Sequence, residues 1–217
     1  MVRFENLTKS FWFRGRRRVV IDRLNLTLPS GRSLALLGRN GAGKSTLLDI
    51  IAGVQTGDTG KVFSDGTISW PVGFGGSFHP QMTGVQNVRF VARIYGVDSD
   101  GLLEFVQEFS ELGRMIDSPV RTYSSGMKAR LGFGLSMGIK FDTYLVDEVT
   151  AVGDAAFNRK SNLVFRDRVR NDSAIMVSHQ MGKLRDFCDA GIVLNQGQLE
   201  YFDDLEEAIE RHQALLA

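Results

Sequence analysis

Three short runs of apolar residues stand out along the chain, at Ser33 to Leu37, Thr143 to Val146 and Ala174 to Val177. Each run is continuous instead of alternating, which is typical of a strand buried on both faces of a parallel sheet. Helical patterns lie between the runs. Strands that alternate with helices predict an α/β fold, with helices covering both faces of the sheet.

The first third of the chain has a different pattern, because apolar and polar residues alternate there. Val2-Arg3-Phe4-Glu5 alternates at every position and predicts a half-buried antiparallel strand. Asp65-Gly66 separates Lys61-Val62-Phe63 from Thr67-Ile68-Ser69-Trp70, and an Asp-Gly pair between two such runs predicts a β-hairpin. We therefore expect an antiparallel β subdomain beside the parallel sheet.

From Thr83 to about Met137 the strand pattern stops and apolar residues recur with helical spacing. We expect a helical subdomain here, approximately 83–137, inserted in a single domain that spans 1–217. One predicted helical face contains Val85, Val88, Val91, Ala92 and Tyr95. A second contains Leu102, Phe105, Val106, Phe109 and Leu112.

The end of the chain predicts one hairpin and one helix. Asn195-Gln196-Gly197 follows the last core strand and is typical of a hairpin turn. Asp204 is expected to begin a helix. The apolar face of that helix contains Leu205, Ala208, Ile209, His212 and Leu216.

Composition narrows the function classes. With 43% apolar and 24% charged residues, the 217-residue chain can bury one substantial core. The net charge of +1 gives no general attraction to nucleic acid, so no nucleic-acid partner is expected. The basic run Arg14 to Arg18 is most simply a solvated hairpin tip, and attraction to anionic lipid or nucleic acid is the alternative.

The single cysteine, Cys188, excludes an intramolecular disulfide and favours a reducing compartment. We expect it to be a buried or half-buried bystander. The N-terminus lacks the apolar core of a signal peptide, and no apolar run approaches the ~20 residues needed to span a bilayer. A soluble, cytoplasmic chain is expected, which leaves docking on a membrane protein open.

The run from Gly38 to Ser45 fits G-x-x-x-x-G-K-[ST] in full, after a predicted strand and before a predicted helix. This context indicates a phosphate loop rather than a plain glycine-rich connector. Glycines let backbone amides turn towards phosphate oxygens, and the helix N-terminus adds positive charge. Lys44 is expected to reach the β- and γ-phosphates and Ser45 to offer its hydroxyl to magnesium. The residues predicted to bind nucleotide are Gly38, Arg39, Asn40, Gly41, Ala42, Gly43, Lys44, Ser45 and Thr46.

Acidic residues and a histidine follow the next two predicted strands. Asp147 ends Tyr144-Leu-Val-Asp147, at the sheet edge where it could hold magnesium, and Glu148 could polarise a water towards the γ-phosphate. The alternative is that the two acids merely cap a strand. His179 follows Met176-Val-Ser, where it could sense the γ-phosphate or the attacking water. A hydrogen-bonded core histidine is the structural alternative.

The run Tyr123-Ser124-Ser125-Gly126-Met127 narrows the field of phosphate-loop proteins. It resembles the signature motif of ATP-binding cassette (ABC) proteins, usually L-S-G-G-Q, and it lies upstream of the Asp147-Glu148 pair as in that family. The resemblance covers nearly the whole chain, because Ala151-Val-Gly-Asp154 lies at the D-loop position and His179 at the switch position. It implies a RecA-like phosphate-loop core with an antiparallel β subdomain and an inserted helical subdomain.

The resemblance also implies an ATPase that works as a head-to-tail homodimer enclosing two ATP molecules. Ser124, Ser125, Gly126 and Met127 would then act across the dimer on nucleotide held by the other copy. Glu148 and His179 would be catalytic, Ser45 and Asp147 would hold magnesium, and Phe11 would stack on the base. Trp12 is the alternative to Phe11, and either aromatic could simply pack on its own domain.

Longer segments are similar to the ATPase subunits of bacterial capsular polysaccharide exporters: Ile68-Ser-Trp-Pro-Val-Gly, Thr83-Gly-Val-Gln-Asn-Val and Val146-Asp-Glu-Val-Thr-Ala-Val-Gly-Asp. Relatives that export O-antigen or teichoic acid are the alternative. The capsule resemblance implies two copies of a polytopic membrane subunit, a periplasmic co-polymerase or adaptor and an outer-membrane channel as partners. It places the chain on the cytoplasmic face of the inner membrane as a peripheral subunit.

The sequence departs from the family pattern at two places. Where many ABC proteins have a magnesium-binding glutamine, this chain has His79, with Gln81 two residues later, so either residue could take that role. Ser125 and Met127 replace glycine and glutamine of the signature motif. Two other classes stay open: a soluble ABC-type ATP switch without a membrane partner, and a phosphate-loop kinase or regulatory ATPase without the head-to-tail dimer.

Overall fold

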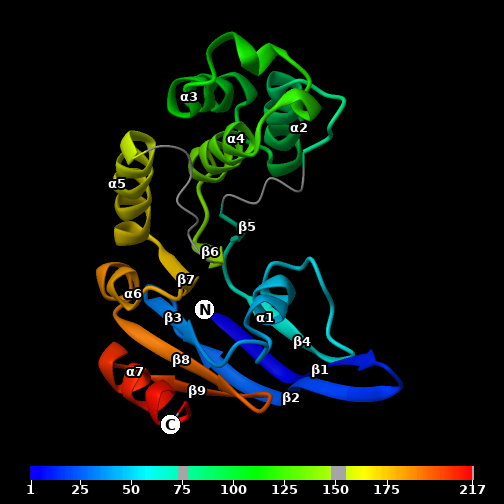
Figure 1. Ribbon diagram of the computed structural model, residues 1–217, viewed down its shortest axis with the longest axis vertical. Coiled ribbons are helices and arrows are strands. Elements are labelled where there is room, and N and C mark those ends of the chain that lie inside the picture. The colour runs from blue at the N-terminus through cyan, green and yellow to red at the C-terminus, as the bar shows by residue number, and fades with distance from the viewer. Residues whose placement is uncertain (73–77, 148–154, 217) are drawn as a thin grey trace. The chain divides into compact units, whose positions relative to one another are not determined.

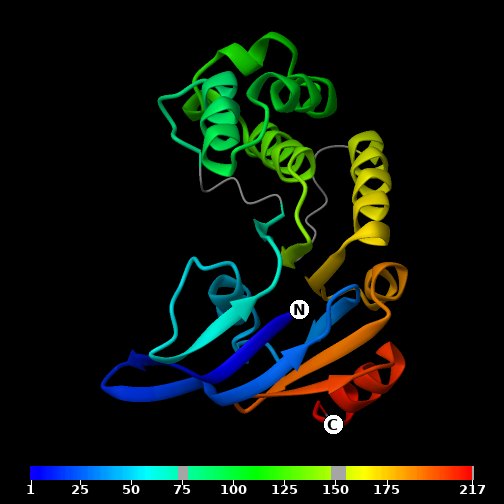
Figure 2. The same cartoon turned by 180° about the vertical axis from the view of Figure 1, so that it is seen from behind.

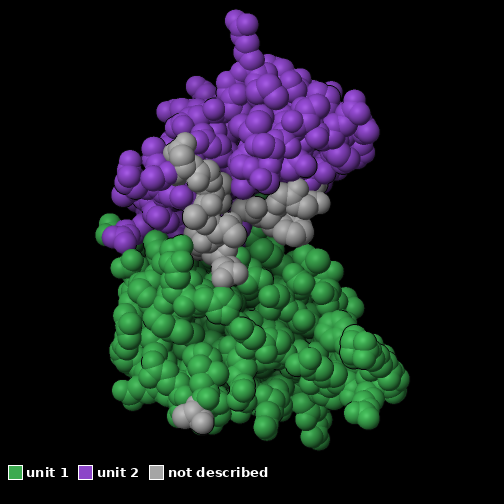
Figure 3. All heavy atoms as spheres, in the orientation of Figure 1, with its two compact units in different colours: residues 1–71, 141–148, 169–217 green, residues 72–140, 149–168 purple. Residues whose placement is uncertain are grey.

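The computed structural model describes residues 1–72, 78–147 and 155–216 of the chain. The chain divides into two compact units (Figure 3). The first comprises Met1–Pro71, Phe141–Glu148 and Val169–Ala217, and the second comprises Val72–Lys140 and Val149–Arg168.

The first unit contains two sheets and three helices that lie wholly within it (Figure 1). Its elements are β1 (Val2–Phe13), β2 (Arg16–Leu28), β3 (Ser33–Leu37), α1 (Lys44–Ile51), β4 (Thr59–Ser64), β5 (Ile68–Pro71), β6 (Thr143–Asp147), β7 (Ser173–Val177), α6 (Met181–Phe187), β8 (Ala190–Asn195), β9 (Gln198–Phe202) and α7 (Leu205–Ala214).

The larger sheet has six strands in the order β5-β6-β7-β3-β8-β9. The five strands β5, β6, β7, β3 and β8 run parallel, and β9 is antiparallel at the edge. The smaller sheet has three antiparallel strands in the order β2-β1-β4. The three apolar runs of the sequence are the central strands β3, β6 and β7, which confirms the predicted α/β fold with an antiparallel sheet beside the parallel one.

The hairpin predicted at Asp65-Gly66 is wrong. Strand β4 pairs with β1, whereas β5 leaves that sheet and pairs parallel with β6, with Ile68 opposite Thr143. The carboxylate of Asp142 accepts hydrogen bonds from both the backbone N–H and the hydroxyl of Thr67, each at 2.7 Å. Asp142 therefore fixes the chain at the start of β5 and directs it into the larger sheet.

The core of the first unit lies between the smaller sheet, α1 and one face of the larger sheet. Leu34 and Leu36 of β3 belong to this cluster together with Leu47 and Leu48 of α1. The opposite face of the larger sheet is covered by α7, which lies along β8 and β9 in the reverse view (Figure 2). A side chain at Gly191 would overlap the Cβ of Ala208, so this glycine lets α7 approach β8 closely.

The second unit contains helices, which agrees with the helical patterns of the sequence. Its elements are α2 (Gly84–Tyr95), α3 (Ser99–Ser110), the 3-10 helices η2 (Gly113–Asp117) and η3 (Val120–Thr122), α4 (Ser125–Gly138) and most of α5 (Ala155–Asn171). Thr83 and Gln86 form a capping box at the start of α2, and Gly96 ends that helix in the left-handed conformation.

An aromatic cluster forms the centre of this unit. Phe109 of α3 stacks on Phe105 and Phe133 at centroid distances of 5.8 and 5.7 Å and meets the edge of Phe157 at 5.3 Å. The predicted face of α3 is therefore the buried one, because Leu102, Val106 and Phe109 are buried there. Among the described residues, no helix combines the length and the apolar character needed to cross a membrane.

Candidate functional site

The phosphate loop connects β3 to α1 and depends on three glycines in conformations that other residues rarely adopt. Gly38, Gly41 and Gly43 have φ angles of +152°, +74° and +111°. A Cβ at Gly38 would lie 2.6 Å from the carbonyl oxygen of Leu194, and one at Gly43 would overlap Val20 Cγ1. Both glycines are therefore required by the fold of the loop.

Lys44 is the first residue of α1, and its side chain folds back over the loop. Its Nζ donates to the carbonyl oxygens of Gly38 at 2.8 Å and Arg39 at 3.2 Å. The ammonium group therefore lies beside the backbone that precedes the helix, whose N-terminal end adds partial positive charge. This arrangement is suited to an anionic ligand.

A cavity of about 550 Å³ opens over the loop, within the size range of small-molecule sites. It lies at the carboxyl ends of β3, β6 and β7, which are neighbours in the sheet. Asp147 ends β6 and His179 follows β7, so the predicted carboxylate and imidazole do meet the loop at one sheet edge. The lining residues are Phe11, Phe13, Arg18, Val20, Asn40, Gly41, Gly43, Lys44, Ser45, Thr46, Asp147, Val177 and His179.

The cavity offers oxygen donors of the kind that magnesium prefers. The Ser45 hydroxyl and the Asp147 carboxylate both line it. Mg²⁺ is usually bound by one or two such protein oxygens together with phosphate oxygens of a substrate. A cluster of three or more His, Cys, Asp or Glu side chains suited to a metal does not occur in the described parts of the chain. The donor set therefore fits magnesium held jointly by the protein and a nucleotide.

The β1–β2 hairpin forms the aromatic wall of the cavity. Phe11 and Phe13 line it, which fits strand geometry because residues two apart face the same side. Trp12 lies between them, is 74% exposed and faces the other side of the hairpin. The predicted Phe11 is therefore placed at the cavity and its alternative Trp12 is not. Phe13 was missed, although the same alternation could have indicated it.

Arg18 is the second lining residue that the sequence interpretation missed. Its guanidinium Nη2 donates to the carbonyl oxygen of Gly41 at 2.7 Å, so it is tied to the phosphate loop instead of belonging to a solvated tip. The strand register places Arg18 there, since it pairs across the strands with Phe11. Arg14 is in the turn itself, as predicted.

Three predicted loop residues do not line this cavity. Arg39 and Ala42 line a neighbouring hollow of about 410 Å³ on the loop, and Arg39 donates to the carbonyl oxygen of Leu215 at 3.3 Å. Gly38 contributes its carbonyl to Lys44. These three residues therefore shape the loop from outside the cavity.

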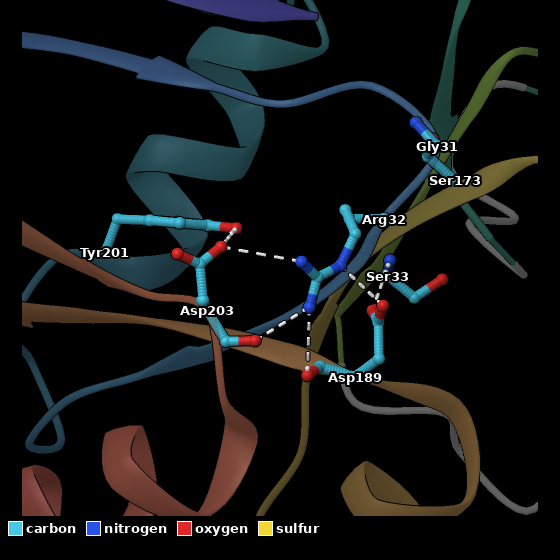
Figure 4. Close-up of polar contacts among 7 residues, drawn as sticks. All are labelled: Gly31, Arg32, Ser33, Ser173, Asp189, Tyr201 and Asp203. Carbon is cyan, nitrogen blue, oxygen red and sulfur yellow. Dashed lines mark hydrogen bonds and ion pairs between the residues drawn. The ribbon is translucent and has the colours of Figure 1, made fainter.

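The start of β3 is fixed by a polar network (Figure 4). Arg32 donates to the carboxylate of Asp189 at 2.5 Å and to the carbonyl oxygen of Asp203 at 2.7 Å. The other Asp189 oxygen accepts the backbone N–H of Ser33 at 2.9 Å. The hydrogen bond to Asp189 raises the pKa of Arg32 above its ordinary value. The network ties the strand that carries the phosphate loop to the elements around β8 and β9.

His212 and Cys188 are titratable residues buried in the first unit. His212 of α7 is buried, and its Nδ1 has no hydrogen-bond partner among the described residues. Burial lowers the pKa of His212, and the positive charge of Lys44 lowers it further. Burial raises the pKa of Cys188 to about 12, with a smaller contribution from Asp189, so the thiol stays protonated and unreactive at neutral pH.

The signature residues lie in the second unit, at the start of α4. Ser124 caps this helix, because its Oγ accepts the backbone N–H of Met127 at 3.2 Å. Ser125 is the first helical residue. A Cβ at Gly126 would meet Ser124 Oγ at an ordinary distance of 3.9 Å as its nearest described neighbour. Contacts among the described residues therefore do not require glycine at this position.

The remaining predicted residues divide into two groups. His79 and Gln81 lie in the second unit with exposed side chains. Asn87 holds the backbone of His79, accepting its N–H at 2.8 Å and donating to its carbonyl oxygen at 3.2 Å. Glu148 and Asp154 lie outside the described residues.

Comparison with known proteins identifies the family. Residues 21–151 match the family model described as "ABC transporter". The chain is 49% identical to "Polysialic acid transport ATP-binding protein KpsT" of Escherichia coli, over 98% of this chain and 96% of that protein. It is 42% identical to "Capsule polysaccharide export ATP-binding protein CtrD" of Neisseria meningitidis serogroup B, over 99% of this chain and 100% of that protein.

The fold has a counterpart among solved structures. A dimeric post-hydrolysis state of the ATP-binding cassette MJ0796, bound to ADP and Pi, matches with a TM-score of 0.77 and 20% identity. The match covers 94% of this chain and 99% of that one. The phosphate loop of this chain, its sheet topology and its sequence similarity to KpsT and CtrD over nearly the whole length all support one assignment. This chain belongs to the ABC transporter family.

Proposed function

We propose that this chain is the ATP-hydrolysing subunit that powers export of capsular polysaccharide across the inner membrane through a partner membrane subunit. The observation that carries the proposal is the cavity that unites Lys44, Ser45, Asp147 and His179 at one sheet edge. The similarity to KpsT and CtrD over nearly their whole lengths supports the choice of cargo. In this proposal 1–217 is one ABC ATPase domain, with the helical subdomain at about 83–137 as its insertion.

In the proposed mechanism, the loop amides and Lys44 bind the β- and γ-phosphates, and Phe11 stacks on the adenine. Ser45 and Asp147 would supply oxygen ligands to magnesium, which would neutralise phosphate charge when bound. Glu148 takes the proton of the attacking water, and His179 holds the γ-phosphate from the end of β7. Each of these groups acts on a charge or a proton that changes during hydrolysis.

The proposed dimer explains the glycine of the signature run. Contacts among the described residues do not require glycine at 126, yet a side chain there would obstruct a ligand or backbone that approaches the start of α4. Ser124, Ser125, Gly126 and Met127 would face ATP held by a second copy, and Asp154 would contact that copy. Bound ATP then stabilises the closed dimer, and hydrolysis removes this stabilisation.

The proposed membrane partner needs an apolar contact surface on the second unit. Phe90 and Ile94 are one helical turn apart on α2 and are 52% and 62% exposed. Exposed apolar side chains at helical spacing support contact with a polytopic membrane subunit, present in two copies. His79 or Gln81 would link nucleotide state to that contact. A periplasmic co-polymerase or adaptor and an outer-membrane channel complete the proposed route, with this chain peripheral on the cytoplasmic face.

The enzymatic part of the proposal is tested with Glu148→Gln. This change removes the base but keeps the size of the side chain, so ATP should bind while turnover stops and an ATP-dependent dimer accumulates. Light scattering and phosphate release on the same sample measure both effects. Lys44→Ala is the matched control, because it should lose at least about tenfold in ATP affinity and form no dimer. Normal turnover by Glu148→Gln would remove Glu148 from this role.

A further inference from the structure

Arg18 has a place in the first unit that no nucleotide-binding motif explains. It lies on β2, in the middle of the basic run Arg14 to Arg18, and its guanidinium reaches the phosphate loop through the 2.7 Å hydrogen bond to Gly41. It also lines the cavity that holds Lys44, Ser45 and Asp147. The other arginines of the run do not line this cavity.

The order of residues along the hairpin indicates which part of a bound ligand Arg18 would contact. Val20, Arg18 and Phe11 share one face, because Val20 is two residues from Arg18 and Phe11 pairs with Arg18 across the strands. Val20 packs against Gly43 of the loop, so this face leads from the phosphate loop through Arg18 to the aromatic wall. A ligand that places its base on Phe11 and its terminal phosphates at Lys44 must pass Arg18 between them.

The chemistry of the guanidinium fits that position. Arginine carries five N–H donors in a planar fork that matches phosphate oxygens. The bond to Gly41 uses one of them, and it holds the side chain over the loop before any ligand enters. The Arg18 side chain is therefore already ordered in the free protein, so less entropy is lost when a phosphate binds.

We propose that Arg18 is a further nucleotide-binding residue, which contacts the phosphate nearest the ribose while Lys44 binds the terminal phosphates. This inference rests on the proposed function, since it assigns a residue to the same nucleotide site. It gives the phosphate loop a second cation that reaches it from the β1–β2 hairpin.

The test compares Arg18→Gln with Arg17→Gln. Glutamine at 18 removes the charge but keeps an amide that can donate to Gly41. Arg17 is the matched control, because it pairs with Trp12 on the opposite face of the hairpin and its Nε donates to Ser10 Oγ at 3.1 Å. Displacement of a fluorescent ATP analogue by ATP, ADP, AMP and adenosine gives the four affinities for each protein.

Arg18→Gln should lower the affinities for ATP, ADP and AMP by a similar factor of about ten, which is the usual effect of losing one charge-assisted hydrogen bond. Adenosine lacks a phosphate, so its affinity for Arg18→Gln should equal its affinity for the unaltered chain. Arg17→Gln should change none of the four affinities by more than about twofold, because exposed charges are screened. Arg18→Lys, which keeps the charge without the fork, should fall between the two.

Unchanged ATP and AMP affinity in Arg18→Gln would overturn the inference. An equal loss for adenosine and AMP would also overturn it, because Arg18 would then act on the base or on packing. Failure of the unaltered chain to bind ATP would contradict the proposed function itself, which keeps the two failures distinct. Thermal unfolding without nucleotide should be the same for all four proteins, which confirms that the comparison concerns binding.

Discussion

Gly43 shows at the scale of one residue how the sequence determines the site. Its φ of +111° and its contact with Val20 leave no room for a side chain, so the motif glycine is required before any ligand is considered. The sequence predicted this loop, together with Asp147 and His179, because short motifs fix local backbone and the topology of parallel strands brings their ends together.

Arg18 could not be predicted in the same way. In the basic run Arg14 to Arg18 the arginines look alike in the sequence. The direction of each side chain depends on the register of β1 with β2. That register contains shifts between Phe4 and Ser10, which the alternation of apolar residues does not show. Once the pairing is known, Arg18 and Arg17 separate into one residue at the phosphate loop and one on the opposite face.

His212 gives a prediction about pH at this scale. Burial lowers its pKa in the folded protein below the ordinary value of 6.5, so the unfolded chain binds the proton more readily. The free energy of unfolding therefore falls as pH drops below 6.5, and the loss levels off below the folded pKa. His212→Leu removes this titration. Chemical denaturation at pH 7.5 and 5.5 should show a smaller loss of stability for the variant, and equal losses would contradict the shift.

At the scale of elements, the helices and central strands were predicted well and one connection was not. Strand β3 and the buried face of α3 follow directly from apolar spacing. The hairpin at Asp65-Gly66 failed because Asp142, far along the chain, binds Thr67 and draws β5 into the parallel sheet. A local turn pattern carries no information about such a distant competitor, so tertiary contacts decide which sheet receives a short strand.

The start of α4 yields a prediction that separates two roles of Ser124. Ser124→Ala removes the N-cap and should lower the free energy of unfolding by about 1 kcal/mol. Ser124→Asn keeps a capping oxygen and should leave stability nearly unchanged. If the hydroxyl acts on ATP across a dimer, both variants should lose ATP turnover. Denaturation and phosphate release measure the two effects, and full turnover by Ser124→Asn would restrict Ser124 to capping.

At the scale of the whole molecule, the order of motifs was more informative than any one of them. Phosphate loop, helical segment, signature run, acidic pair and histidine occur in the order of the ABC family, and the family match and the solved fold agree with it. A head-to-tail partner and a membrane subunit are properties of an assembly, so their residues can be proposed from one chain but only an experiment on the assembly tests them.

The most direct test of the proposed function is the location of capsular polysaccharide in the native host. The gene is deleted and replaced with the unaltered sequence or with Glu148→Gln, and polymer is quantified on the surface and inside the cell. We expect polymer to accumulate inside the deletion and Glu148→Gln strains and to return to the surface with the unaltered gene. Normal surface capsule in the deletion strain would contradict it, and loss of O-antigen instead would identify the alternative cargo.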